Sequence, residues 1–145
     1  MESSIRPLTI DHYDDILRVW MDAGLPIKRR GREGREMVEA EMARDYVGYF
    51  GLFMDDRLVG VAIAQFEGRH GWISRLAVEP DYRGRELAGK LILACEEFLA
   101  QFGDELVISA LVEDDNAPSM DCLRKAGFVC HPAIRYWSKR GRPDL

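Results

Sequence analysis

The sequence predicts a mixed α/β fold, in which a sheet of about seven strands carries four helices on its two faces. Three observations lead to this prediction. Strand-like runs occur along most of the chain, two helical patterns lie near the N-terminus, and a long apolar helical stripe stands between two strand-like runs. A helix that joins two strands usually makes a parallel crossover, so parallel and antiparallel pairs should share one sheet.

The N-terminal part is expected to supply one strand and two helices. Ile5–Leu8 reads as a short strand, and the apolar positions that follow recur at helical spacing: Tyr13, Ile16, Leu17 and Trp20. A turn at Gly24–Pro26 ends this helix. A basic loop over residues 28–35, KRRGREGR, leads into a second helix over 32–44, whose apolar stripe is thin.

Three consecutive strands are expected in the middle of the chain. Gly48–Met54 and Leu58–Phe66 are β-rich runs joined by the short polar connection Asp55–Arg57, which is typical of an antiparallel hairpin. Trp72–Val78 follows after a short turn. The three strands should therefore form a meander.

The C-terminal part of the chain is expected to contain a long helix, a short helix and three strands. From Arg85 the apolar period becomes helical, with one stripe formed by Leu87, Leu91, Cys95, Phe98 and Phe102. Leu106–Val112 suits a buried strand and Pro118–Lys125 a short helix. Phe128–Cys130 and Ile134–Ser138 are predicted as two final strands.

Length and composition favour a single domain over residues 1–145. At 47% hydrophobic residues, the chain can bury a core without a metal or a disulfide. The net charge of -5 argues against a general nucleic-acid binder, so we interpret the basic loop as solvated. No apolar run approaches the roughly 18 residues of a membrane span. The odd cysteine count, without CxxC spacing, and the lack of a signal peptide favour a reducing cytoplasm.

No metal site is predicted. The three histidines have no metal-ligand spacing with the cysteines: His12, His70 and His131. The cysteines lie on apolar positions, where an inert core thiol is the expected state.

The segment between Val78 and the long helix has the residues of an anion site. Unpaired N–H groups and the positive end of the helix favour a bound phosphate there, and Gly84 and Gly89 permit close backbone approach. An ordinary solvated turn is the alternative interpretation. Residues 84–90 also match GxxxxGK, the start of a nucleotide-binding P-loop, but Leu91 has no hydroxyl for magnesium.

These residues resemble the GCN5-related N-acetyltransferase (GNAT) family, whose motif Arg/Gln-x-x-Gly-x-Gly/Ala corresponds here to Arg83–Ala88. The resemblance covers nearly the whole chain, including the Leu76–Pro80 segment and the late Asn116…Gly127-Phe128 signature. It implies the acyl-CoA N-acyltransferase fold, with acetyl-CoA as co-substrate and an amine acceptor that attacks the thioester directly. A homodimer also fits the resemblance, because dimers are frequent in this fold.

The resemblance also implies which residues bind the cofactor. The backbone of Leu76, Ala77 and Val78 would hold the pantetheine and polarise the thioester carbonyl. Asn116 would contact the cofactor where the strands part, and it can also cap the following helix. The N–H groups around the pyrophosphate would come from Arg83, Gly84, Arg85, Glu86, Leu87, Ala88 and Gly89.

The chain departs from the family at two positions. Glu86 stands where the motif has glycine, and we expect its side chain to turn outward to Arg83 or Arg85. Leu123 stands where many members carry a tyrosine that protonates the departing thiolate. Tyr136 and Glu113 are then the candidate catalytic residues.

The departures leave a second hypothesis open, a non-catalytic acyl-CoA binding or sensing module of the same fold. The acceptor should bind between the first two helices and the last strands. The sequence does not identify which amine it is.

Overall fold

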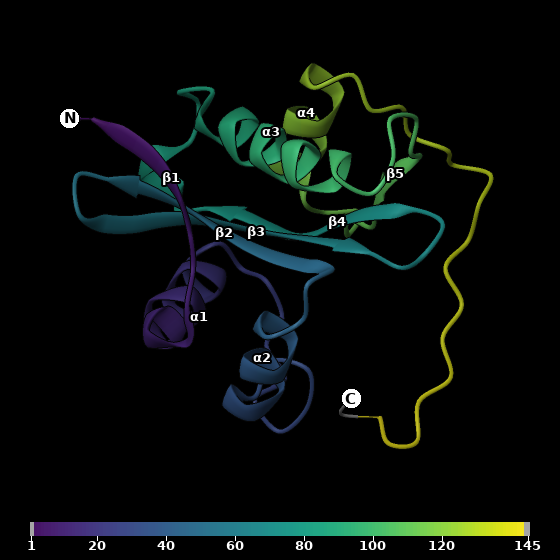
Figure 1. Cartoon of the computed structure of the whole chain (residues 1–145), viewed down its shortest axis with the longest axis horizontal. Helices are drawn as coiled ribbons and strands as arrows, with labels where there is room; N and C mark the ends of the chain where they lie inside the picture. Colours follow the sequence, from purple (N-terminus) through teal and green to yellow (C-terminus); the bar gives the residue numbers. More distant parts are fainter. Residues whose placement is uncertain (1, 144–145) are drawn as a thin grey trace.

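A five-stranded mixed sheet forms the centre of the fold, with helices on both faces (Figure 1). The computed structural model describes residues 2–143. The strands lie side by side in chain order, and only the last pair, β4 with β5, is parallel. Their bounds are β1 Ser3–Pro7, β2 Val47–Met54, β3 Arg57–Phe66, β4 Gly71–Val78 and β5 Ile108–Ala110. The predicted meander and the parallel crossover are both confirmed.

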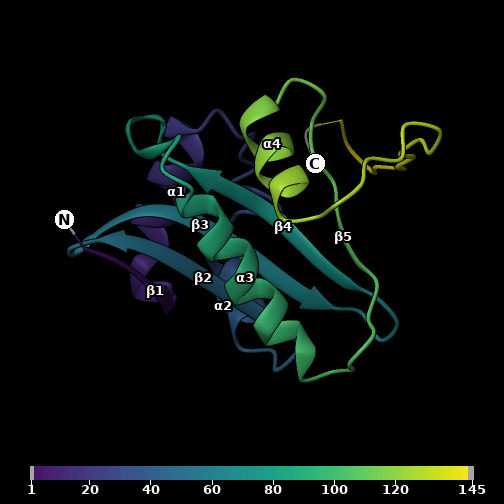
Figure 2. The ribbon, with the colours of Figure 1, turned by 90° about the horizontal axis from the view of Figure 1, so that it is seen from above.

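Residues 2–143 contain four α-helices, which form two layers, one on each face of the sheet. Helices α1 (Tyr13–Asp22) and α2 (Arg35–Met42) cover one face, and α3 (Leu87–Ala100) and α4 (Ala117–Lys125) cover the other. Figure 2 shows α3 crossing the strands with α4 beside it. The helix count agrees with the sequence prediction, although α2 is shorter than expected at both ends.

Each face of the sheet has its own apolar core. Ile16, Val19 and Trp20 of α1 are buried against the sheet, as their helical spacing predicts. Leu91 and Cys95 of α3 are buried on the opposite face. Strand β3 lies in the middle of the sheet and is apolar on both sides, because both of its faces are covered.

Glycine lets α3 lie close to the sheet. A Cβ atom on Gly60 of β3 would lie 3.0 Å from Leu91 Cδ1, and one on Gly71 would lie 2.8 Å from Leu99 Cδ1. A larger residue at either position would push α3 outward, and with it the loop that begins this helix.

The strand count differs from the sequence prediction. Residues 2–143 contain five strands and not seven, because neither Phe128–Cys130 nor Ile134–Ser138 forms a strand. After Phe128 the chain leaves the body as an extended segment, residues 129–143, which we name the C-terminal arm (Figures 1 and 2). A strand needs a neighbour to hydrogen-bond with, and β5, at the edge of the sheet, has only three residues to offer. Pro132 also lacks a backbone N–H, which weakens strand pairing in this segment further.

Candidate functional site

The site is centred on β4, at the point where it separates from β5. The two strands pair only through Gly71–Ile73 and Ile108–Ala110. From Ser74 to Val78 the β5-side edge of β4 has no strand partner, so its backbone groups are left for other contacts. This is the stretch in which Leu76, Ala77 and Val78 were predicted to bind pantetheine.

A bulge shapes β4 at the same point. The register against β3 shifts between Val61 and Ile63, and Arg75 takes a left-handed backbone conformation with φ 54°. Trp20 of α1 donates a hydrogen bond from Nε1 to the Arg75 carbonyl at 3.2 Å. A non-glycine residue at positive φ costs on the order of 1 kcal/mol and persists only where its surroundings hold it, as Trp20 does here.

The loop from β4 to α3 contains two further left-handed residues. Gly84 has φ 77° and Glu86 has φ 59°. Arg83 folds back, and its Nε donates to the Val78 carbonyl at 3.1 Å. Glu86 is the N-cap of α3, but its side chain accepts no capping hydrogen bond. The first N–H groups of α3 therefore have no side-chain acceptor at the N-cap, and they point out of the helix end as an anion-binding site requires.

The loop has room for a ligand. A Cβ atom on Gly84 or on Gly89 would meet no heavy atom within 4 Å, so both glycines face open space. Together with the uncapped helix end, this space fits the predicted pyrophosphate position between Arg83 and Gly89. The hydrogen bond from Arg83 to the Val78 carbonyl ties the start of this loop to β4.

The expected partner of Glu86 is not found. Glu86 is exposed, as predicted, but Arg85 stacks over Tyr82 and donates to the Asp81 carbonyl, while Arg83 is bound to Val78. Neither arginine pairs with Glu86 in the described part of the chain. The sequence prediction was wrong here because the backbone carbonyls at the end of β4 and in the short turn after it are closer acceptors.

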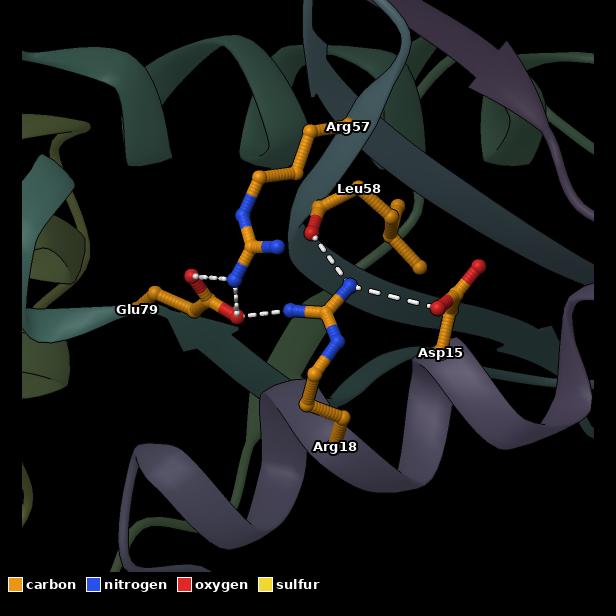
Figure 3. Close-up of polar contacts among 5 residues, drawn as sticks. All are labelled: Asp15, Arg18, Arg57, Leu58 and Glu79. Carbon is orange, nitrogen blue, oxygen red and sulfur yellow. Dashed lines mark hydrogen bonds and ion pairs between the residues drawn. The ribbon is translucent and has the colours of Figure 1, made fainter.

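A buried carboxylate fixes the end of β4. Glu79 is 5% exposed and forms ion pairs with Arg18 of α1 and Arg57 of β3 (Figure 3). The Arg57 contact is 3.2 Å, and Arg18 also donates to the Leu58 carbonyl at 3.0 Å. The network joins one helix to two strands directly before the loop. Sequence reasoning did not find Glu79, because its partners lie far away in the chain.

Helix α4 contacts β4 at Leu76, beside the free edge. Asn116 is its N-cap and accepts a hydrogen bond from the Ser119 N–H at 3.3 Å, which confirms the capping role. The Ser119 hydroxyl, which is buried, donates to the Leu76 carbonyl at 3.2 Å. Leu123 packs in the core beside α3. Ser119 was not predicted, although it lies one helical turn before Leu123.

The two candidate catalytic residues are exposed, and the side chain of neither makes a hydrogen bond or ion pair with β4 in the described part of the chain. Glu113 is exposed in the loop between β5 and α4. Tyr136 lies in the C-terminal arm and is 64% exposed. Tyr136 was expected on a final strand beside the site. Because that strand does not form, no element of the sheet holds Tyr136 next to β4.

A polar cluster lies on the α1 side of the bulge instead. The Arg75 guanidinium stacks over Trp20, and its Nη2 lies 3.9 Å from Oε1 of Glu33, a buried residue of the α1–α2 loop. Burial lowers the pKa of Arg75, and Glu33 partly opposes this effect. Nearby, burial and Glu41 raise the pKa of Tyr49, whose hydroxyl donates to Glu41 at 2.7 Å. Sequence reasoning did not find the contact between Arg75 and Glu33, because the two residues lie far apart in the chain.

The cysteines are not arranged as a reactive site. Burial raises the pKa of the Cys95 thiol to about 12, and it also raises that of Cys122. Cys130 is exposed in the C-terminal arm, so the prediction of a core thiol is wrong for this cysteine, because the strand expected to bury it does not form. Residues 2–143 hold no group of three or more side chains placed to bind a metal ion, and no helix among them is both long and apolar enough to cross a membrane.

Comparisons with known proteins agree on one family. The model of the acetyltransferase (GNAT) family matches residues 12–128. An acetyltransferase of Sodalis glossinidius is 28% identical over 134 residues, which is 92% of this chain and 85% of that protein. The N-terminal acetyltransferase B complex catalytic subunit NAA20 of Arabidopsis thaliana is 26% identical over 88 residues, or 57% of this chain; the match spans about half (51%) of the plant protein.

Solved structures show the same fold. The PaiA N-acetyltransferase of Thermoplasma acidophilum, solved in complex with coenzyme A, superposes with a TM-score of 0.78 at 19% identity, over 92% of this chain and 94% of that one. An aminoglycoside 6'-N-acetyltransferase of Acinetobacter baumannii gives 0.77 at 15% identity, over 96% and 99% of the two chains.

Proposed function

The chain belongs to the acetyltransferase (GNAT) family, and from this premise we propose that it binds acetyl-CoA along the free edge of β4 and transfers the acetyl group to an amine. The observation that carries the proposal is that two features meet at the end of β4. Its unpaired edge leads directly into a glycine-containing loop and an α3 N-terminus without a side-chain cap. The unpaired edge can bind the amide groups of the pantetheine arm, and the loop with the α3 N-terminus can bind the pyrophosphate.

Each part of the site has a distinct task in this proposal. Acetyl-CoA supplies the activated thioester. The N–H groups of Leu76 and Val78 would bind the pantetheine arm and polarise the thioester carbonyl as charge develops on its oxygen. The loop Arg83–Gly89 would bind the pyrophosphate through backbone donors, and Asn116 would contact the cofactor from α4. Ser119 holds α4 against Leu76, so it positions this wall of the site.

The amine must lose a proton, and the departing thiolate must gain one. Glu113 and Tyr136 stay our candidates for these transfers, with water as the relay where the distance is long. A positioned acid or base contributes about 10²- to 10⁴-fold, so an enzyme without the usual tyrosine at Leu123 would be slow but active. We expect the protein in a reducing cytoplasm, where its cysteines stay as thiols.

The test combines binding and turnover. Calorimetry with coenzyme A should give a saturable one-site isotherm, and Gly84→Glu, which forces a side chain into a left-handed position facing the ligand, should abolish it. Acetyl-CoA consumption should then be followed over a broad amine panel by mass spectrometry, because the exposed Cys130 would react with thiol reagents.

The outcomes separate the two hypotheses. Binding with acetylation of at least one amine supports the enzyme. Binding without acetylation of any amine would favour the acyl-CoA sensing module, which Leu123 and Glu86 make the second candidate. If coenzyme A does not bind at all, the proposed site is wrong.

A further inference from the structure

The Arg75 guanidinium is the most unusual polar group outside the cofactor site. Its side chain is 21% exposed, yet its Nε and Nη2 atoms are buried and have no hydrogen-bond partner in the described part of the chain. Buried donors of a charged group are rarely left in this state, because each missing bond costs on the order of 1 to 3 kcal/mol. Such a group is a candidate for binding a ligand.

Glu33 does not fill this role. Its Oε1 lies 3.9 Å from Nη2, which is too long for a hydrogen bond, and the same oxygen already accepts the Lys28 N–H at 2.7 Å. Glu33 therefore offsets part of the charge of Arg75 without satisfying its donors. The guanidinium is held in place by the Trp20 ring, 4.5 Å from Arg75 Cζ.

The two unsatisfied atoms have the geometry of a carboxylate receptor. Nε and Nη2 lie on one edge of the guanidinium plane, and their N–H bonds point in nearly the same direction. This edge matches the two oxygens of a carboxylate, which binds such a fork through two parallel hydrogen bonds. The adjoining loop carries four basic residues, Lys28, Arg29, Arg30 and Arg32, against the single acid Glu33, and Arg35 begins α2 directly after it, so the local field also favours an anion.

The position of Arg75 connects this receptor to the reaction. Arg75 directly precedes Leu76, and it lies just beyond Ile73, the last β4 residue paired with β5. A carboxylate bound to Arg75 on the α1 side of the bulge would keep an amine of the same molecule close to this part of β4. We propose, on the basis of the proposed function, that the acceptor is a primary amine that also carries a carboxylate, and that Arg75 binds this carboxylate.

Two sources of the carboxylate can be distinguished by experiment. The experiment compares three kinds of acceptor: free amino acids, the amines formed by their decarboxylation, and amidated peptides that begin with Asp or Glu. Preference for free amino acids assigns the α-carboxylate, and preference for the peptides assigns the side-chain carboxylate. In either case the carboxylated acceptor should have the higher kcat/KM, by on the order of 100-fold.

Arg75→Met should remove this preference by lowering kcat/KM for carboxylated acceptors on the order of 100-fold, with less than about threefold change for decarboxylated ones. Activity on the decarboxylated amines reports that the variant is folded. Arg75→Lys, which keeps the charge and loses the fork, should recover only part of the preference. Arg69→Met is the matched control, since Arg69 is an exposed arginine of the β3–β4 turn, outside this cluster, and its loss should leave the preference unchanged.

Equal kcat/KM for both classes of acceptor, or equal losses in Arg75→Met for both, would overturn the proposal. If no amine is acetylated, the proposed function fails by itself, and binding then decides the inference. Amino acids should bind to the protein saturated with coenzyme A and not to the saturated Arg75→Met variant. Absence of binding, or binding that is equal in the two proteins, would refute the carboxylate site.

Discussion

Replacing Glu86 by glycine should improve both folding stability and cofactor binding. Glu86 has φ 59°, and a side chain in the left-handed region costs about 1 to 2 kcal/mol. Glycine removes this cost but adds about 0.5 to 1 kcal/mol of entropy to the unfolded chain. The net gain is about 0.5 to 1 kcal/mol. With an unfolding entropy of about 0.3 kcal/mol/K for 145 residues, the Tm should rise by about 2 to 3 °C.

The effect on binding has a separate electrostatic origin. A carboxylate about 8 Å from a doubly charged pyrophosphate costs on the order of 1 kcal/mol in water at low salt, which is about fivefold in Kd. At physiological ionic strength the Debye length is about 8 Å, and screening reduces the gain to about twofold. Glu86→Gly should therefore tighten coenzyme A binding, and the improvement should shrink as salt is added.

Two control variants separate strain from charge. Glu86→Gln keeps the left-handed side chain and loses the charge, so it should tighten coenzyme A binding without raising the Tm. Asp55→Gly relieves another left-handed residue, with φ 55° in the β2–β3 turn, and should leave the coenzyme A affinity unchanged. Calorimetry and thermal unfolding measure both quantities. If Glu86→Gly strongly weakens coenzyme A binding, the Glu86 side chain belongs to the binding surface and the reasoning is refuted.

Three further predictions concern other parts of the molecule. Glu79→Gln should lower the Tm by about 8 °C, because the loss of a buried carboxylate between two partly exposed arginines costs about 2 to 3 kcal/mol; a change under about 2 °C in thermal unfolding would contradict this account. The Cys95 thiol, with its pKa raised to about 12, should resist alkylation at pH 8 to 9 until the protein unfolds, whereas Cys130 should react at once, as peptide mass mapping will show. Tyr136→Phe should lower kcat about 10²-fold or more with little change in coenzyme A affinity, and an unaltered kcat would remove Tyr136 from the candidates.

The order of elements could be predicted because it is encoded locally. The helical spacing of Ile16 and Trp20, the hairpin at Asp55–Arg57 and the stripe from Leu87 to Cys95 each depend on residues a few positions apart. The loop before α3 was also found from its own residues. In each case the physical cause, a period or a turn, lies within one short window of the sequence.

The parts that could not be predicted depend on residues distant in the chain. Glu79 meets Arg18 across 61 positions, and the Arg75 carbonyl meets Trp20 across 55. Nothing near Glu33 in the sequence indicates that it lies against Arg75. The prediction of two final strands failed for a related reason. Their apolar residues fit the pattern of a strand, but a strand also needs a neighbouring strand to pair with, and a local sequence pattern does not show whether one is available.

These long-range contacts explain how the free part of β4 is kept in shape. A strand edge without a partner would normally be mobile, yet a site that binds a thioester needs backbone donors at fixed positions. Helix α1 holds this stretch from the opposite face. Trp20 binds the carbonyl of Arg75 at its beginning, and Arg18 pairs with Glu79 at its end. Two residues of one helix therefore support both ends of the open edge, so the rigidity that a neighbouring strand would supply comes from behind the sheet, and the β5 side stays free for the cofactor that we propose there.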